Sequence, residues 1–168
     1  DWTSNGRARA TTWRTIILIE VTFFWQANAF DRRLEDVWNM PTIADKRRAY
    51  RDMHASGCFV LPNPWDIGTA RYLQHLGFKA VATTSAGYAF SQGLPDNAVS
   101  RDKMLAHIAE IVAATDVPVN ADFEGGYAHE PEGVAGSVRL CLETGVAGLS
   151  IEDSTGDRAD PLYDLEHA

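Results

Sequence analysis

The stretch Val119-Asn120-Ala121-Asp122-Phe123-Glu124-Gly125-Gly126-Tyr127 is a short apolar run that ends in carboxylates and glycines. Residues i and i+2 of a strand point to the same side, so Asp122 and Glu124 are expected to project together at the strand end. A later run, Leu149-Ser150-Ile151, ends in Glu152 and Asp153 in the same way. Carboxylates that converge at neighbouring strand ends repel one another unless a hard cation lies among them. Mg²⁺ prefers such oxygen ligands, so we predict a magnesium site here, with Mn²⁺ as an alternative ion.

Outward from this stretch, the chain repeats one plan of buried strand and amphipathic helix. Apolar strands separated by such helices predict a parallel sheet covered by helices. Polar residues follow each of the four predicted strands, which favours a β/α barrel with its site at the carboxyl face over a doubly wound open sheet. We therefore predict an α/β fold, a (β/α)8 TIM-type barrel of which about the first four β/α units are present, preceded by a helix. The predicted strands are 58–61, 79–84, 117–122 and 148–152, and the predicted helices are 43–56, 66–77, one from Ser100, 131–145 and one that starts near Tyr163.

Residues 1–39 differ from the rest of the chain, because they contain four of the five tryptophans and carry no net charge. The run Met40-Pro41-Thr42-Ile43 looks like a natural beginning, in which Thr42 caps the first helix and an acid at position 45 follows. We expect two parts: an N-terminal extension, 1–39, and the first half of a barrel domain, 40–168. A signal peptide is the alternative for the extension, although Glu20 interrupts its apolar run.

Composition excludes several classes of function. The net charge is -8, with no cluster of basic residues, which argues against a nucleic-acid partner. The apolar run from Ile16 to Trp25 is too short to span a membrane. The two cysteines, Cys58 and Cys141, have apolar neighbours and no ligand-like spacing, so both are predicted to be small core residues in a reducing, cytoplasmic compartment.

Five motifs occur in an order that resembles the isocitrate lyase/phosphoenolpyruvate mutase superfamily, in particular members such as phosphonopyruvate hydrolase and methylisocitrate lyase. The likeness covers residues 40–168, about half of a usual member. The motifs are Asn63-Pro64-Trp65-Asp66, Thr84-Ser85-Ala86-Gly87, Gly93-Leu94-Pro95-Asp96, Asp122-Phe123-Glu124-Gly125-Gly126-Tyr127 and Ser150-Ile151-Glu152-Asp153.

The resemblance implies a magnesium-dependent lyase that cleaves a C–C or C–P bond beside a small 2-oxo or 2-hydroxy carboxylate, through an enolate. It implies that Asp122 binds the metal directly, while Glu124 and Glu152 act through metal-bound water. Backbone amides of Ser85, Ala86 and Gly87 would hold the substrate carboxylate, and Trp65 would contact the substrate. Asp96 would lie near the water shell and, with Glu124, is a catalytic candidate. Family members are commonly tetramers, so a homo-oligomer is expected of the full-length form.

One departure from the family bears on activity. The mobile segment that follows the strand-four Glu in the lyases and mutases carries a Lys and, in the lyases, a Cys. Residues 154–161 contain neither, so true isocitrate lyase activity is not expected and the proton donor is unassigned. Two alternatives stay open: a catalytically inactive half-barrel fragment, which would expose unpaired strand edges, and a metal-dependent pyruvate aldolase.

Overall fold

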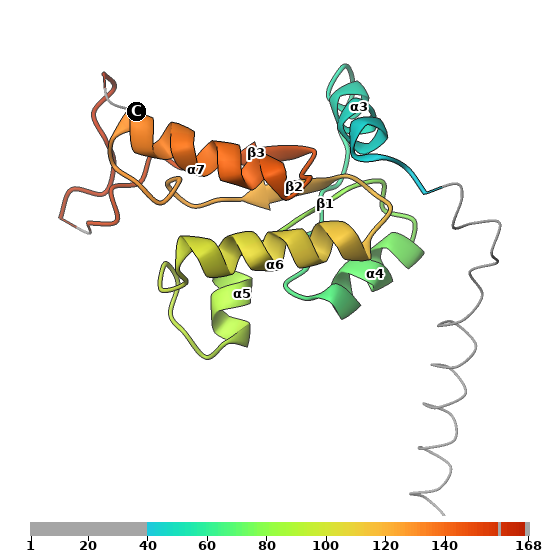
Figure 1. Ribbon diagram of the computed structural model, residues 1–168, viewed down its shortest axis with the longest axis horizontal. Helices are drawn as coiled ribbons and strands as arrows, with labels where there is room; N and C mark the ends of the chain where they lie inside the picture. The colour runs from blue at the N-terminus through green and yellow to red at the C-terminus, as the bar shows by residue number, and fades with distance from the viewer. Residues whose placement is uncertain (1–39, 158, 167–168) are drawn as a thin grey trace, which may run out of the picture. The chain divides into compact units, whose positions relative to one another are not determined.

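Short parallel strands alternate with helices through residues 40–157 and 159–166, which are the residues that the computed structural model describes (Figure 1). The chain divides into two compact units, Asp1–Met40 and Pro41–Ala168, and the elements below belong to the second. The predicted extension, 1–39, lies outside the described residues. In chain order the elements are α3 (Ile43–Met53), α4 (Ile67–His75), β1 (Val81–Ala82), α5 (Ser85–Ser91), α6 (Arg101–Ala114), β2 (Val119–Asp122), α7 (Pro131–Glu143) and β3 (Gly148–Ser150).

The three strands form one parallel sheet in the order β1-β2-β3. Val81 of β1 pairs with Val119, and Asp122 at the end of β2 pairs with Ser150 of β3. The prediction of a parallel α/β fold is thus confirmed. Closure into an eight-stranded barrel stays a prediction.

The core lies between this sheet and the helices that cover it. Along β2 the side chains alternate, so Val119 and Ala121 are buried while Asn120 and Asp122 are partly exposed. Helix α6 contributes a buried apolar face that contacts β2, and α4 lies beside α6 (Figure 1). Each fully buried large apolar side chain contributes roughly 1.5–3 kcal/mol. The buried cluster consists mainly of Ala70, Val81, Ala89, Val99, Met104, Ile108, Ile111, Val112, Val119, Ala121, Phe123, Cys141 and Val146.

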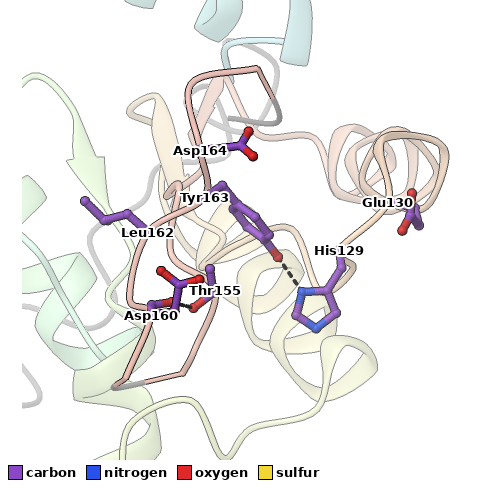
Figure 2. Close-up of a pocket in the computed structure, with 7 residues that line it drawn as sticks. All are labelled: His129, Glu130, Thr155, Asp160, Leu162, Tyr163 and Asp164. Carbon is purple, nitrogen blue, oxygen red and sulfur yellow. Dashed lines mark hydrogen bonds between the residues drawn. The ribbon is translucent and has the colours of Figure 1, made fainter.

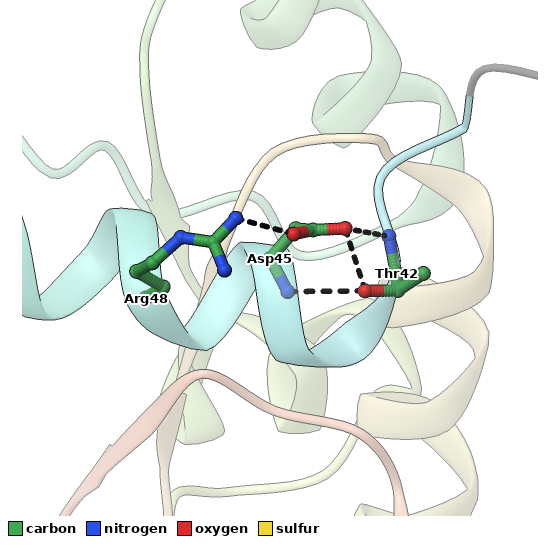
Figure 3. A network of polar contacts seen from close by, with 3 residues as sticks. All are labelled: Thr42, Asp45 and Arg48. Atoms are coloured by element: carbon green, nitrogen blue, oxygen red, sulfur yellow. Dashed lines mark hydrogen bonds and ion pairs between the residues drawn. The ribbon is translucent and has the colours of Figure 1, made fainter.

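Helix α3 begins where the sequence predicts, with a capping box at Thr42. The Thr42 hydroxyl accepts a hydrogen bond from the backbone N–H of Asp45, and the Asp45 carboxylate accepts one from the Thr42 N–H in return (Figure 3). Arg48 forms an ion pair with the same carboxylate. Two orphan donors at the helix start are satisfied in this way, which defines where α3 begins.

The strand predicted at 58–61 is wrong. One backbone hydrogen bond, from the Ala82 N–H to the Pro62 carbonyl, links this segment to β1, and one bond is not a ladder. Pro62 and Pro64 have no N–H to donate, which limits further pairing. Val60 is 69% exposed, and Cys58 is exposed as well, so its predicted core position is also wrong. Cys141 is buried as predicted, and burial raises the pKa of its thiol to about 11.

Two further predictions differ from the structure. No helix is predicted between the strand 79–84 and Ser100, yet residues 85–91 form α5, whose N-cap Thr84 accepts a hydrogen bond from the Gly87 N–H. The helix expected near Tyr163 is absent from the described residues. That segment instead folds back, with an antiparallel bridge between Ser154 and Leu162. The Tyr163 N–H donates to the Asp153 carbonyl in the same turn-back.

None of the described helices combines the length and apolarity that a membrane span requires.

The predicted strands are longer than the observed ones, because Pro118 lacks an N–H and β3 has no described strand on its outer side.

Candidate functional site

Asp122 is the best-oriented acid at the carboxyl edge of the sheet. Its Oδ2 accepts two hydrogen bonds from Ser85, one from the backbone N–H at 2.8 Å and one from the hydroxyl at 2.9 Å. The backbone N–H of Asp122 donates to the Thr83 hydroxyl at 2.9 Å, which ties the end of β2 to the residue after β1. No described residue donates a hydrogen bond to Oδ1. One oxygen of a firmly held carboxylate is therefore available to a ligand.

Glu124 is buried, although its carboxylate is not satisfied. Its side chain is 8% exposed, and Oε1 has no hydrogen-bond partner among the described residues. Burial raises the pKa of Glu124, and the neighbouring charges of Asp96, Asp122 and Glu152 raise it further, against an opposing effect of the Tyr127 hydroxyl. A buried polar atom without a partner costs about 1–3 kcal/mol, so this carboxylate is held at the expense of stability.

The turn that carries Glu124 has an unusual backbone. Glu124, Gly126 and Tyr127 have φ values of 49°, 76° and 59°. Such values cost of order 1–3 kcal/mol in residues other than glycine and persist only where the surroundings impose them. Here the Glu152 N–H donates to the Glu124 carbonyl at 2.9 Å, and the Gly126 N–H donates to the Phe123 carbonyl. β2 ends at Asp122, where the predicted strand 117–122 also ends, so Glu124 lies in the turn and the alternation of side chains along a strand does not set its direction.

Glu152 and Asp96 approach the same region from exposed positions. The backbone hydrogen bond just described places Glu152 beside the turn, while Asp96 lies in the loop after α5 and accepts a hydrogen bond from the Asn97 N–H. Both charges act on the pKa of Glu124, so the four predicted acids share one electrostatic neighbourhood. Within the described range, no Lys or Arg forms an ion pair with any of them.

These acids do not form a ready-made cage of ligands. In the described part of the chain, no three His, Cys, Asp or Glu side chains are grouped as a metal-ligand set. The residues nevertheless fit a hard divalent ion that keeps several of its waters, because all the donors are oxygens and the charge is uncompensated. Oε1 of Glu124, which has no partner among the described residues, would accept a hydrogen bond from such a water. Asp122 would bind such an ion directly, and Glu124 and Glu152 would reach it through water.

The amides predicted to bind a substrate carboxylate form the first turn of α5. The Ser85 N–H already donates to Asp122 and the Gly87 N–H to Thr84, which leaves the Ala86 N–H without a partner among the described residues. Trp65 borders this turn and is 46% exposed; a Cβ added at Gly87 would lie 3.3 Å from the Trp65 Cβ. The structure thus brings Trp65, Ser85, Ala86 and Gly87 together next to Asp122.

The described residues also form a surface pocket, and none of the predicted site residues lines it. Figure 2 shows the ring of His129 and the hydroxyl of Tyr163 joined by a hydrogen bond across this pocket. Its walls are the segment before α7 and the turned-back segment after β3. The lining residues are His129, Glu130, Thr155, Asp160, Leu162, Tyr163 and Asp164.

Tyr127 and Thr83 are the site residues that the sequence reasoning missed. Tyr127 stands at the end of the quoted motif, three residues after Glu124, and its hydroxyl is buried. Its position after two glycines was a usable signal, because such a turn can fold a side chain back toward the strand end. Thr83 precedes the motif of its strand and gave no signal of its own.

Comparison with known proteins identifies relatives of this chain. The family model described as phosphoenolpyruvate phosphomutase matches residues 50–168. An uncharacterised protein of Mycobacterium tuberculosis is 37% identical over 112 residues, 66% of this chain and 42% of that protein. The 2-methylisocitrate lyase of Escherichia coli is 34% identical over 85 residues, 49% of this chain and 29% of that enzyme.

A solved structure agrees with these sequence matches. The crystal structure of a candidate lyase/mutase from Burkholderia cenocepacia aligns with a TM-score of 0.73 and 52% identity, over 74% of this chain and 46% of that one. The chain spans less than half the length of these relatives. The resemblance inferred from the five motifs is confirmed, and the chain belongs to the phosphoenolpyruvate phosphomutase family.

Proposed function

We propose that the protein containing this chain is a Mg²⁺-dependent lyase that cleaves a C–C or C–P bond beside a small 2-oxo or 2-hydroxy carboxylate. The observation that carries the proposal is the pair formed by Asp122, whose Oδ2 is held by Ser85, and Glu124, which is buried with an unpartnered oxygen. Relatives that include a 2-methylisocitrate lyase support the reaction class.

Each site residue has a role that its contacts support. Asp122 would hold the ion directly, with Glu124 and Glu152 behind its waters, and Mn²⁺ would substitute for Mg²⁺. When bound, a divalent ion stabilises negative charge on a substrate oxygen as a Lewis acid. The Ser85 hydroxyl and N–H keep Asp122 in one orientation, so that it does not need to reorganise during the reaction.

Substrate recognition is proposed for the turn at the start of α5. The Ala86 N–H is available to a substrate carboxylate, whereas the Ser85 and Gly87 amides act indirectly by fixing Asp122 and Thr84. Trp65 would exclude water from one side of the bound substrate. Asp96 is exposed, so we propose that its carboxylate accepts hydrogen bonds from the water shell of the ion. The group that protonates the product is not assigned.

The test measures release of a 2-oxo acid from a panel of 2-oxo and 2-hydroxy diacids, with Mg²⁺ and with EDTA. Both the 168-residue chain and a version extended beyond Ala168 are assayed. Asp122→Ala is expected to abolish Mg²⁺-dependent cleavage, and the matched variant Asp52→Ala, on the exposed surface of α3, is expected to retain it. Cleavage that survives Asp122→Ala would contradict the assignment.

A second candidate is that this chain by itself is inactive. The outer edge of β3 has no described partner strand, and an unpaired edge favours association. Sedimentation velocity separates the cases: a stable monomer would argue against an association driven by this edge. Assembly of a full-length form into a tetramer stays a prediction of the family resemblance. The aldolase alternative predicts aldehyde-dependent condensation with pyruvate in the same assay.

A further inference from the structure

Two buried polar atoms without partners come from opposite ends of the turn 124–127. They are Oε1 of Glu124 and the hydroxyl oxygen of Tyr127. Buried polar groups nearly always have a partner, so two such atoms close together call for a missing polar group between or beside them. Burial is the main cause of the raised pKa of Tyr127, and the charges of Glu124, Asp122 and Asp96 add to it, so the hydroxyl lies within electrostatic reach of these acids.

The turn holds these two side chains in place from several sides. The φ values of Glu124 and Tyr127 are both positive, and the Glu152 N–H anchors the Glu124 carbonyl. Beneath the turn, the Tyr127 ring packs edge-on against the ring of Phe123 at 5.1 Å. A Cβ at Gly126 would lie 2.9 Å from Val134 of α7, so the backbone cannot shift easily toward that helix.

The Tyr127 hydroxyl can donate one hydrogen bond, and the carboxylate oxygens of Glu124 are acceptors, so the two groups are chemically matched. The Tyr127 hydroxyl lies near enough to the Glu124 carboxylate to lower the pKa of that acid, yet neither this hydroxyl nor Oε1 of Glu124 has a hydrogen-bond partner among the described residues. A small adjustment, or one shared water, would satisfy both atoms.

We propose that Tyr127 is a positioning residue for the divalent ion: its hydroxyl donates to the Glu124 carboxylate, or to a water shared with it, and so orients Glu124 toward the water shell of the ion. This inference rests on the proposed metal-dependent function. A role limited to packing on Phe123 is the competing explanation, and it needs the ring but not the hydroxyl.

The experiment measures Mn²⁺ binding by electron paramagnetic resonance, without any substrate or turnover. Tyr127→Phe removes one oxygen atom and keeps the ring, and it is expected to weaken Mn²⁺ binding about tenfold, as partners behind metal ligands typically do. Tyr72→Phe, at an exposed position of α4, is the matched control and is expected to bind as the parent does. Unchanged affinity in Tyr127→Phe would overturn the inference.

A double-mutant cycle tests whether Tyr127 acts through Glu124. In a Glu124→Gln background, Tyr127→Phe is expected to change Mn²⁺ affinity by less than about twofold, because coupled residues lose their separate effects. A full tenfold effect in that background would overturn the proposed route. If the parent chain binds no Mn²⁺, the metal site itself fails; if the parent binds and Tyr127→Phe binds equally, only the role of Tyr127 fails.

A measurement on chains that keep Tyr127 covers the case in which Tyr127→Phe does not fold. The chain is labelled with 3-fluorotyrosine, and variants in which each of the other four tyrosines is replaced by Phe identify the ¹⁹F signal of Tyr127. Addition of Mg²⁺ is expected to shift the Tyr127 signal and to leave that of Tyr72 unchanged. A Tyr127 signal that does not respond while Mn²⁺ still binds would overturn the inference.

Discussion

The two ends of the parallel sheet treat their polar groups in opposite ways. At the amino end, cationic side chains of α3 and α4 donate to the carbonyls left open where α6 and α7 end. Lys46 reaches the Val112 and Thr115 carbonyls, Arg47 those of Leu142 and Val146, and Arg71 that of Ala114. At the carboxyl end, Asp96, Asp122, Glu124 and Glu152 form no ion pair with a described Lys or Arg, and Oε1 of Glu124 has no partner among the described residues.

The contrast separates stability from function. A helix C-terminus carries partial negative charge and unsatisfied carbonyls, so donors from α3 and α4 complete it and stabilise the fold. A binding site needs the reverse, namely polar atoms that the chain itself leaves unsatisfied. The same division is usual in β/α barrels, in which the carboxyl face carries the active site and the amino face contributes to stability. Variants at each end should therefore affect different measurements.

The largest effect is expected at Asp122. Asp122→Asn keeps the shape and can still accept from Ser85, but it removes the negative charge, so Mn²⁺ affinity should fall by at least about 100-fold, the upper range for groups behind a ligand. Stability in EDTA should change little. Electron paramagnetic resonance and urea unfolding measure the two quantities, with Asp52→Asn as control. Retained affinity would remove Asp122 from the site.

A comparable loss, but of stability, is expected at Lys46. Lys46→Met keeps most of the aliphatic chain and leaves two carbonyls without their donor, so the free energy of unfolding should fall by about 1–3 kcal/mol. Mn²⁺ affinity should stay within about twofold of the parent, because distant sites that share no partners are only weakly coupled. Arg48→Met, whose ion pair with Asp45 is exposed, is the control. Weaker metal binding in Lys46→Met would show that the two ends are coupled.

The sequence predicts which residues lie at the carboxyl end of the sheet, because the end of each strand can be recognised from nearby residues. Asp122 follows a buried run, and its neighbour Ser85 follows another, so a parallel sheet brings them together without further information. Helix α7 was equally clear, since Pro131 opens it and Gly145, with a φ of 89°, follows its end.

The failures have tertiary causes or concern signals of ambiguous meaning. An apolar run at 58–61 predicts burial, but pairing depends on a neighbour that only the fold supplies. The sequence analysis predicts no helix directly after Thr84, although a threonine at this place can cap one, as it does in α5. The left-handed backbone of Glu124 depends on a hydrogen bond from Glu152, and the burial of Lys46 depends on where α6 ends. Neither can be inferred from nearby residues.

A smaller effect, in the opposite direction, is expected from Glu124→Gln in EDTA. Burial raises the pKa of Glu124, so the ionised carboxylate destabilises the fold: this group favours folding below the ordinary carboxyl pKa, and its contribution is lost as pH rises through the raised value. Gln carries no charge, so the variant should be more stable than the parent at pH 7 by about 1 kcal/mol.

The gain should shrink at a pH below the ordinary range of Glu, where the parent is also neutral. Urea unfolding at the two pH values checks this, with Glu143→Gln, exposed at the end of α7, as control. A destabilised Glu124→Gln protein at pH 7 would mean that the carboxylate has a structural partner, and the contrast between the two ends would then weaken.

The smallest effect is expected at His107 of α6. It tests whether every buried polar atom without a partner marks a ligand-binding site. His107 is 4% exposed, its Nε2 has no partner among the described residues, and its ring stacks on Tyr88 at 3.8 Å. Burial lowers its pKa, against smaller opposing effects of Glu110 and Asp66. The neutral ring thus favours folding above the ordinary histidine pKa, and this contribution is lost as pH falls through the lowered value.

His107→Gln should therefore lose less stability than the parent between pH 7 and pH 5, by at most about 1.4 kcal/mol per pH unit for one proton. The difference between variant and parent, measured by urea unfolding at several pH values, isolates this residue from the carboxylates, and His75→Gln on the exposed side of α4 is the control. Mn²⁺ affinity should not change in either variant. Parallel pH profiles for parent and His107→Gln would refute the argument, whereas a flatter profile with intact metal binding would show that an unpartnered atom indicates a ligand site only where uncompensated charge accompanies it.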